Sequence, residues 1–412
     1  MHRIQMGSQS RLTSLLLASM AGLLVVCIII YPNSVFQSSL SGMSLWWEYV
    51  FPALLPFLIL TEIMLGSGAL HAIGTLLDPF MRFFFRTSGN GGWALAMGLF
   101  AGYPAGASTT AKLHERQALL PQEAERVLIV SHLCNPAVMI TVIGVGFFHQ
   151  ATLGMFIAIV HYASALLMGL TLRRSGNENL LVATPANLEP IWTRAMQSAK
   201  AAQQEDGRKF GKLLGDGVSH SIQTLMLIGG WMMFFSVLQQ VILHLLQPWI
   251  TNEGFVAQLV VCLLEPHLGA YTIAQSSSAS LVIKVAIVGA VLGWSGLSMH
   301  AQVKSLLKST EMRYLAFLKA RLLHAALAFG LTLLAWKPLN NLLDRLQPNA
   351  LPTYIEGTFN SPHLSIGNWI PSLWNLAGDR TLIFLTLLSI MLFCCMGISW
   401  SIHKVQLLKL KK

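Results

Sequence analysis

Long apolar segments recur along the whole chain, and they constrain its fold more than any other feature. Several reach about 20 residues, the length of helix that crosses a hydrocarbon layer roughly 30 Å thick. Only 11% of the 412 residues are charged and 54% are hydrophobic, whereas soluble domains carry roughly 25% charged residues. Because lipid offers no hydrogen-bond partner to an open backbone, we expect one all-α, polytopic membrane domain.

About eight full crossings are expected, and the distribution of Lys and Arg orients them. Seven basic residues lie between Arg173 and Lys212, so the positive-inside rule places this linker in the cytoplasm. The N-terminus and the basic C-terminal tail are predicted on the same side. The expected crossings are Leu12–Tyr31, Glu48–Gly66, Glu123–Phe148, Ala151–Leu172, Val218–Leu246, Phe255–Ala274, Leu315–Trp336 and Leu382–Ile402.

Polar interruptions divide the chain into six predicted parts. Two of them are similar membrane halves, and the others are linkers or terminal helices. The parts are an N-terminal helix with an amphipathic linker (1–47), a first half (48–172), a basic cytoplasmic linker (173–212), a second half (213–336), an extracytoplasmic loop (337–379) and a final helix with a basic tail (380–412).

Two other apolar stretches are too short or too broken to cross, and each is predicted to form a re-entrant helical hairpin. Gly91–Phe100 is followed by the small-residue segment 102–110, and Leu281–Leu292 is followed by the segment 293–300. Paired broken segments in the two halves of a chain are typical of transporter binding sites. The matched positions, which suggest a weak pseudo-repeat, are Gly102 with Gly293, Tyr103 with Trp294 and Ala107 with Ser298.

The loop charges create a conflict within this prediction. Lys112 and Arg116 follow the first hairpin, and Lys304 and Lys308 follow the second. The positive-inside rule therefore places the bases of both hairpins in the cytoplasm. An inverted repeat would place them on opposite sides of the membrane.

The first hairpin supplies the first candidate binding site. Backbone N–H groups at a helix start carry a partial positive charge that suits a carboxylate or a phosphate, and neighbouring hydroxyls add hydrogen-bonding groups. The alternative is a packing interface, because small residues let helices approach closely. The predicted binding residues are Gly102, Tyr103, Pro104, Gly106, Ser108 and Thr109.

An Asn-Pro pair within an apolar helix is the second candidate. Pro136 removes a backbone donor and frees a carbonyl one turn earlier, so Asn135 and this carbonyl can face a cavity. The alternative is a simple proline kink with a satisfied Asn. Water channels need two Asn-Pro-Ala copies, and this chain has one.

Glu265, directly before Pro266, is the third candidate. An ionisable residue inside a membrane is a functional-site hypothesis by default, because burying it unpaired is costly. The alternative places Glu265 in the headgroup region as a surface charge. Ser295 and Ser298 of the second predicted hairpin complete the predicted binding set.

The remaining motifs support no other chemistry. Glu62 and Lys284 are single charges in apolar runs that could pair with each other or with Glu265, or could couple a proton or an ion. The chain contains no nucleophile elbow, phosphate loop or His-Glu-x-x-His, so no enzyme, metal or cofactor is predicted. The net charge of +10 lies in short clusters between apolar runs, which indicates membrane orientation and not nucleic-acid binding.

An ordered set of motifs in the first half resembles the YlbJ-type sporulation integral membrane proteins. Their core is a nucleoside-recognition, or gate, domain similar in outline to that of concentrative nucleoside transporters. The resemblance is dense over residues 48–172 and thinner in the second half. The motifs are Phe51–Phe57, Asp78–Arg82, Gly102–Ala107, Glu123–Arg126, Asn135-Pro136 and Gly144–Phe148.

This resemblance implies a transporter or permease with two re-entrant hairpins in a bacterial cell membrane. For sporulation members it implies the outer forespore membrane, and dipicolinate, a small aromatic dianion leaving the mother cell, as cargo. The expected partners are this solute and the lipid bilayer, whereas a coupling ion and a homo-oligomer stay open.

Two other functions stay open. A nucleoside permease keeps the fold and changes the cargo, but the first hairpin tip offers hydroxyls and backbone rather than the Asn, Gln and Glu of nucleoside carriers. A non-transporting assembly or signalling protein would tolerate Gly106→Trp better than a binding site would.

Overall fold

The computed structural model describes residues 11–172, 189–249, 254–308 and 310–346, and within these ranges helices and short connections make up the chain. Five helical stretches in these ranges are long and apolar enough to cross a membrane: Pro32–Gly66, Ala151–Thr171, Phe210–Leu246, Leu281–Leu307 and Tyr314–Leu343. The all-α, polytopic fold is therefore confirmed. The expected crossing Leu382–Ile402 and most of the predicted extracytoplasmic loop lie outside the described residues.

The first half begins with a long continuous helix, which starts well before the expected Glu48. Short helices then lead into a hairpin, a broken helix and a closing helix. The elements are α1 (Arg11–Ile30), α2 (Pro32–Leu45), η1 (Trp46–Val50), α3 (Phe51–Gly66), α4 (Ala69–Leu76), α5 (Asp78–Phe80), η2 (Met81–Phe85), α6 (Gly91–Phe100), α7 (Tyr103–Glu115), α8 (Pro121–Ser131), η3 (Val138–Phe147) and α9 (Ala151–Leu172), where η marks a π-helical segment.

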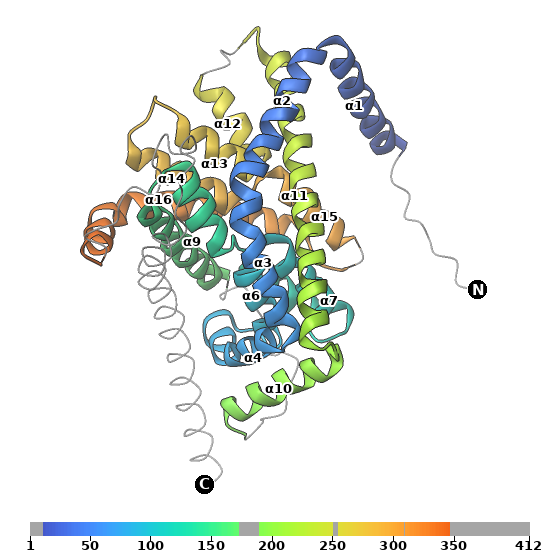
Figure 1. Cartoon of the computed structure of the whole chain (residues 1–412), viewed down its shortest axis with the longest axis vertical. Helices are drawn as coiled ribbons and strands as arrows, with labels where there is room; N and C mark the ends of the chain where they lie inside the picture. The colour runs from blue at the N-terminus through green and yellow to red at the C-terminus, as the bar shows by residue number, and fades with distance from the viewer. Residues whose placement is uncertain (1–10, 173–188, 250–253, 309, 347–412) are drawn as a thin grey trace, which may run out of the picture.

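The second half repeats this order after the amphipathic helix α10 (Ile191–Asp206). A long helix is followed by a hairpin, a broken helix and a closing helix. The elements are α11 (Phe210–Leu246), α12 (Phe255–Leu264), α13 (Pro266–Gln275), α14 (Leu281–Trp294), α15 (Gly296–Leu307) and α16 (Tyr314–Leu346). Helix α11 packs along α2 and α3, and the three run side by side through the molecule (Figure 1).

The second hairpin is not the one expected from the sequence. Helices α12 and α13 pack against each other and form the hairpin, with Glu265-Pro266 at its turn. The expected hairpin at Leu281–Leu307 is instead one long stretch, broken at Ser295 and Gly296, whose φ values of 69° and 70° interrupt the helix. The matching of Gly102 with Gly293 was therefore wrong. Two ten-residue arms, α12 and α13, together have the length of one crossing, which explains the error.

The corrected hairpin resolves the conflict over sidedness. Arg116, at the base of the first hairpin, lies on the basic side that the positive-inside rule makes cytoplasmic. The base of the second hairpin is the serine-rich segment 276–280, which follows α13. In Figure 1, α4 and α10 lie at the bottom and α12 lies near the top. The two hairpins therefore point toward each other from opposite ends of the molecule, the arrangement that an inverted repeat predicts.

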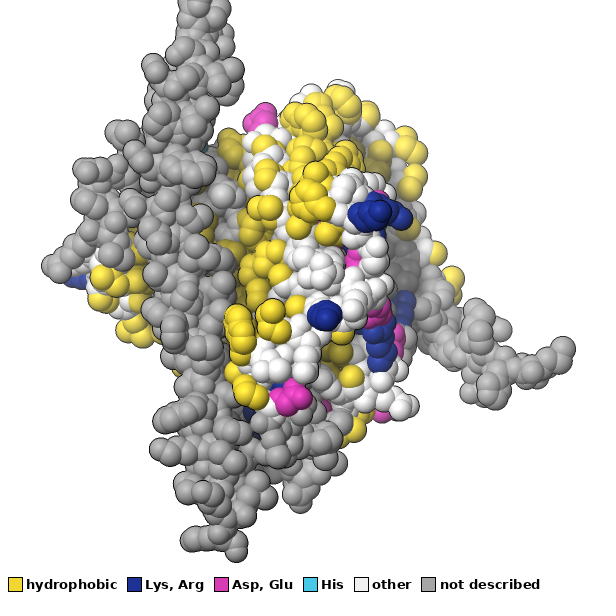
Figure 2. Space-filling model, turned by 60° about the horizontal axis from the view of Figure 1, so that its bottom comes forward, with side chains coloured by type: hydrophobic (Ala, Val, Ile, Leu, Met, Phe, Trp, Pro, Cys, Tyr) yellow, Lys and Arg dark blue, Asp and Glu magenta, His cyan; other side chains and the backbone are white. Residues whose placement is uncertain are grey.

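Each hairpin packs against the broken helix of its own half and against the broken helix of the other half. Helix α7 contacts α8 of its own half and α15 of the other, and α13 contacts α14 and, across the halves, η3. Glycines permit the closest approaches, because a Cβ at Gly98 would lie 1.9 Å from the Ser131 carbonyl oxygen. Figure 2 turns the α4 and α10 end forward and shows charged side chains there beside broad hydrophobic surfaces.

Candidate functional site

Two hairpin tips and two helix breaks meet inside the molecule. From here on we call this meeting point the crossing, as distinct from a membrane-crossing helix. Its four parts are Gly102 at the first tip, residues 132–135 at the first break, Glu265 at the second tip and Ser295 at the second break. The Tyr103 hydroxyl donates a hydrogen bond to the Leu292 carbonyl oxygen at 2.7 Å. This bond ties the first tip to the broken helix of the second half.

Further contacts join the other parts of the crossing. His132 Nε2 lies 3.2 Å from Ser295 Oγ, which connects the two breaks. Trp294 Nε1 donates to the Leu263 carbonyl oxygen at 3.1 Å, and a Cβ on Gly296 would lie 2.6 Å from Pro266 Cδ. The second break therefore lies directly against the second tip.

The same capping chemistry starts two of the helices at the crossing. Asn135 Oδ1 accepts a hydrogen bond from Val138 N at 2.8 Å, and Glu265 Oε2 accepts one from Leu268 N at 2.6 Å. In both cases proline follows the cap, where its missing N–H and fixed φ suit the first helical position. Asn135 therefore has a hydrogen-bond partner, as the proline-kink alternative predicts. It also lies at a break between two helices and not at a kink within one.

Glu265 lies inside the protein and not at the membrane surface. Only 2% of the residue is exposed, so its placement in the headgroup region was wrong. Its second oxygen, Oε1, lies 2.7 Å from Nδ1 of His267, which is also buried. The carboxylate is therefore bound on one oxygen by a helix start and on the other by an imidazole.

Sequence-based prediction missed Arg321, a cation beside the crossing. Arg321 is 0% exposed, and its guanidinium donates to the carbonyl oxygens of His132 at 2.8 Å and Ile129 at 2.6 Å. It thereby caps the C-terminal end of α8, where free carbonyls carry partial negative charge. Within the described ranges, no carboxylate pairs with this guanidinium. The rule that marked Glu265 also applies to Arg321, because Arg321 is an ionisable residue inside the expected crossing Leu315–Trp336.

Buried histidines extend the polar network around Arg321. Arg321 NH1 lies 3.2 Å from His324 Nδ1, and His324 Nε2 lies 3.1 Å from the His161 carbonyl oxygen. The backbone N–H of Cys134 donates to His161 Nε2 at 3.1 Å, so we assign the ring proton of His161 to Nδ1. His161 and His324 therefore belong to one buried polar network with Arg321.

Four buried polar atoms in this region have no hydrogen-bond partner. Buried polar groups in folded proteins are nearly always paired with protein, water or ligand, so each exception needs an explanation. Ser298 belongs to this set, and its role in binding stays a prediction. The atoms are Ser298 Oγ, His132 Nδ1, His161 Nδ1 and Arg321 Nε.

Among the predicted binding residues of the first hairpin, Gly106 packs against α8, as its neighbour Thr110 does. A Cβ on Gly106 would lie 2.1 Å from the Ser131 carbonyl oxygen, and Thr110 Oγ1 lies 3.1 Å from Ser131 Oγ. Thr109 is buried on the same helix, Ser108 is half-buried and Pro104 is exposed. Binding by Pro104, Gly106, Ser108 and Thr109 stays a prediction, and the close-packing alternative accounts for Gly106.

The two isolated charges have partners other than those expected. Lys284 Nζ donates to the Ala274 carbonyl oxygen at 3.1 Å, at the end of α13. Glu62 Oε2 lies 3.8 Å from His220 Nδ1, and both side chains are partly exposed. The expected pairings among Glu62, Lys284 and Glu265 were therefore wrong.

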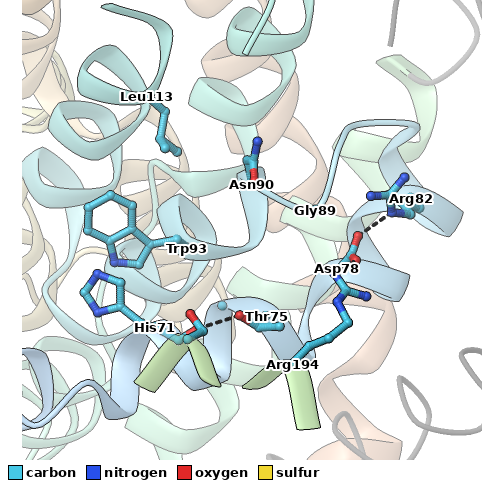
Figure 3. A pocket seen from close by; sticks show the side chains of 11 residues that line it. His71, Thr75, Asp78, Arg82, Gly89, Asn90, Trp93, Leu113 and Arg194 are labelled. Carbon is cyan, nitrogen blue, oxygen red and sulfur yellow. Dashed lines mark hydrogen bonds and ion pairs between the residues drawn. The ribbon is translucent and has the colours of Figure 1, made fainter. Parts of the chain in front are cut away.

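A separate hollow of about 170 Å³ lies between α4, the first hairpin and α10 (Figure 3). Asp78 accepts a hydrogen bond from Arg82, and its other oxygen accepts one from Arg194 of α10 at 2.8 Å. Burial lowers the pKa of His71, which lines this hollow, and the Glu205 carboxylate partly offsets the effect. The ion pairs hold α10 against the first half, so this hollow has a structural explanation.

The fold and the crossing define an α-helical membrane protein with paired re-entrant hairpins and broken helices. A family model described as "Gate: Nucleoside recognition" matches residues 47–170, the first half. The chain is also 38% identical over 345 residues to the sporulation integral membrane protein YlbJ of Bacillus subtilis (strain 168), an alignment covering 80% of this chain and 84% of that protein. The chain therefore belongs to the YlbJ family of sporulation integral membrane proteins. No solved structure matches it.

Proposed function

We propose that this protein carries a small anionic solute across the membrane and catalyses no reaction on it. The observation that carries the proposal is Arg321, a buried guanidinium beside the crossing without a carboxylate partner among the described residues. A charge buried in a membrane protein is costly unless it is paired. An anionic cargo would provide the missing counter-charge.

The helix starts at the crossing favour the same sign of ligand. Helices α7, α13 and α15 and the segment η3 all begin there, and each start carries a partial positive charge. The Glu265 carboxylate is already occupied by Leu268 N and His267. Discontinuous helices whose N-termini point at an anionic group are the usual substrate site of secondary transporters.

Rings near Arg321 suit a flat, aromatic anion. The Phe317 ring lies 5.0 Å from the His132 ring and 5.2 Å from the His300 ring, and Tyr103 lies 5.0 Å from His132. Arg321 lies over Phe317 at 5.4 Å. Dipicolinate combines an aromatic ring with two carboxylates, so we propose it as the cargo. The place of action would be the outer forespore membrane, with transport out of the mother cell, because the relative is a sporulation membrane protein.

A nucleoside is the second candidate cargo, favoured by the nucleoside-recognition description of the matching family model. The two cargoes make different demands on the site. A nucleoside is neutral, so its transport would not need Arg321 as a counter-charge, whereas dipicolinate transport would. Loss of transport in Arg321→Gln therefore separates the two.

The test is uptake of labelled dipicolinate and of labelled uridine into proteoliposomes that contain the purified protein. The sharpest variant is Ser298→Ala, because the Ser298 hydroxyl is buried and unpartnered. Removing such a hydroxyl leaves no protein partner unsatisfied, so stability should not fall. The matched control is Ser221→Ala on α11, which removes another buried, unpartnered hydroxyl on the face of α11 that packs against α3.

We expect dipicolinate uptake by the wild-type protein and by Ser221→Ala, about tenfold less by Ser298→Ala if one hydrogen bond to the cargo is lost, and none by Arg321→Gln. Uptake of uridine by the wild-type protein that persists in Arg321→Gln would move the assignment to a nucleoside permease. Transport of neither solute by folded, correctly inserted protein would favour a non-transporting assembly or signalling role.

A further inference from the structure

A groove of about 510 Å³ runs between the N-terminal ends of α8 and α16, which the positive-inside rule places on the cytoplasmic side. Its α16 wall includes Leu315, Lys319 and Leu323, which are spaced four residues apart and share one face of the helix. Leu315 and Lys319 are exposed, so this wall faces the surroundings of the protein. At this position the surroundings are the inner leaflet of the membrane.

Two cations that line the groove, Arg126 and Lys319, have donor groups without an acceptor in the described part of the chain. Glu125 is already bound by the backbone N–H, Nε and NH2 of Arg313 at 2.8 to 2.9 Å. Arg126 donates from NH2 to the Arg86 carbonyl oxygen, and its Nε is buried without an acceptor. Lys319 makes no ion pair or hydrogen bond with the part of the chain that the structure describes.

These two cations lie at the same depth. Arg126 and Lys319 each follow the first residue of their helix by five positions, about 7.5 Å at 1.5 Å per residue. Both helices start at the cytoplasmic side, so the cations lie just below the membrane surface, where lipid phosphates are found. Deeper in the groove the lining turns apolar, with Ile129, Ala320 and Leu323.

We propose that this groove binds an anionic phospholipid of the cytoplasmic leaflet, with the phosphate on Arg126 and Lys319 and an acyl chain along Ile129 and Leu323. Basic pockets between transmembrane helices on the cytoplasmic side are suited to such headgroups. The lipid lies beside the bond from Arg321 to the Ile129 carbonyl oxygen, which joins the same two helices. A bound lipid therefore clamps α8 to α16 next to the crossing.

The experiment measures lipid binding to the full-length protein by native mass spectrometry and by thermal unfolding in detergent with added phosphatidylglycerol or phosphatidylcholine. The variants are Lys319→Gln, Arg126→Gln and the double variant. The matched control is Lys337→Gln, which removes an exposed lysine from the other end of α16. We expect phosphatidylglycerol to bind the wild type and the control in preference to phosphatidylcholine, with roughly fivefold weaker binding for each groove cation removed.

Each alternative gives a different result. Equal binding of the two lipids by the wild type, or an equal loss in Lys337→Gln, overturns the proposal. If added glycerol phosphate does not displace phosphatidylglycerol, the ligand is a lipid and not a free phosphate. If dipicolinate competes with the lipid, the groove is instead an entrance for the solute. Lys319→Gln changes an exposed side chain, so the test stands even where Arg126→Gln impairs folding. None of these readouts depends on transport.

Discussion

His132 Nε2 lies 3.2 Å from the Ser295 hydroxyl oxygen, and this contact joins the helix breaks of the two halves. The Ser295 hydroxyl donates to the Trp294 carbonyl oxygen at 2.5 Å, so it accepts the hydrogen bond from the imidazole. His132 Nδ1 is then an acceptor, buried and without a donor. The two halves are closed on each other here, and any movement of one against the other has to separate this pair.

Tyr103→Phe should loosen this closure. The change removes the 2.7 Å hydrogen bond to the Leu292 carbonyl oxygen but keeps the ring, at a stability cost of about 1 kcal/mol. Cys134 is 1% exposed and lies next to Tyr103, so its reaction with a maleimide reports opening of the crossing. In a protein whose other four cysteines are serine, we expect faster labelling of Cys134 in Tyr103→Phe than with Tyr103 intact.

The matched control for this prediction is Tyr314→Phe, which removes a hydroxyl that bonds His300 near the cytoplasmic end of α16. Its labelling rate should equal that of the parent protein. Equal rates in all three proteins would show that the Tyr103 hydroxyl does not hold the crossing closed.

Gly106→Ala should destabilise the protein whatever its function. The new Cβ would lie 2.1 Å from the Ser131 carbonyl oxygen and 3.0 Å from Gly98 Cα, so α7 has to move away from α8. Overpacking of this kind costs about 1 to 3 kcal/mol. Thermal unfolding measures the change, and Gly215→Ala is the control. Gly215 lies within α11 with nothing within 4 Å of a Cβ, so alanine there should stabilise by about 0.5 to 1 kcal/mol.

This packing also changes the choice of experiment on function. A non-transporting protein would need the contact between Gly106 and Ser131 as much as a transporter does. Gly106→Trp therefore does not separate the two roles, although the sequence suggested that it would. Ser298→Ala separates them, because it leaves the packing intact.

Composition and apolar length were sufficient to predict the membrane fold, because they follow from the chemistry of lipid. Local chemistry also predicted three of the four parts of the crossing as polar interruptions, at Gly102, Asn135 and Glu265. The fourth, Ser295, was predicted as a binding residue but in the wrong element. Length alone cannot distinguish a hairpin of two short arms from one crossing, and α12 with α13 is such a case.

The capping pattern would have corrected this error. Asn135-Pro136 and Glu265-Pro266 both pair a side-chain acceptor with a proline at the first helical position, so both mark a new helix start. The rule for ionisable residues in a membrane span marks Arg321 as a candidate, but its role depends on carbonyls that are 189 and 192 residues away in the chain. Only the folded arrangement of α8 and α16 brings them together.

Asp78→Asn should release α10 from the first half. Asp78 is buried and accepts hydrogen bonds from both Arg82 and Arg194 (Figure 3). Hydrogen bonds to charged groups are worth about 1.5 to 3 kcal/mol, and the partial exposure of the arginines places the expected loss near the lower end. We expect a lower unfolding temperature and faster proteolysis of α10. Asp216→Asn is the control, because its pair with Arg208 is more exposed, and a loss as large as that of Asp78→Asn would contradict the prediction.

Labelling from the two sides of the membrane tests the inverted repeat. Ser278 lies at the base of the second hairpin and Arg116 at the base of the first, and both are exposed. If the hairpins enter from opposite sides, an impermeant maleimide added to intact cells labels Ser278→Cys and not Arg116→Cys, in a background where the five native cysteines are serine. Inside-out vesicles should give the reverse pattern. Labelling of both positions from one side would mean that the halves are not inverted, and the four helix starts could not then face a common solute from opposite sides.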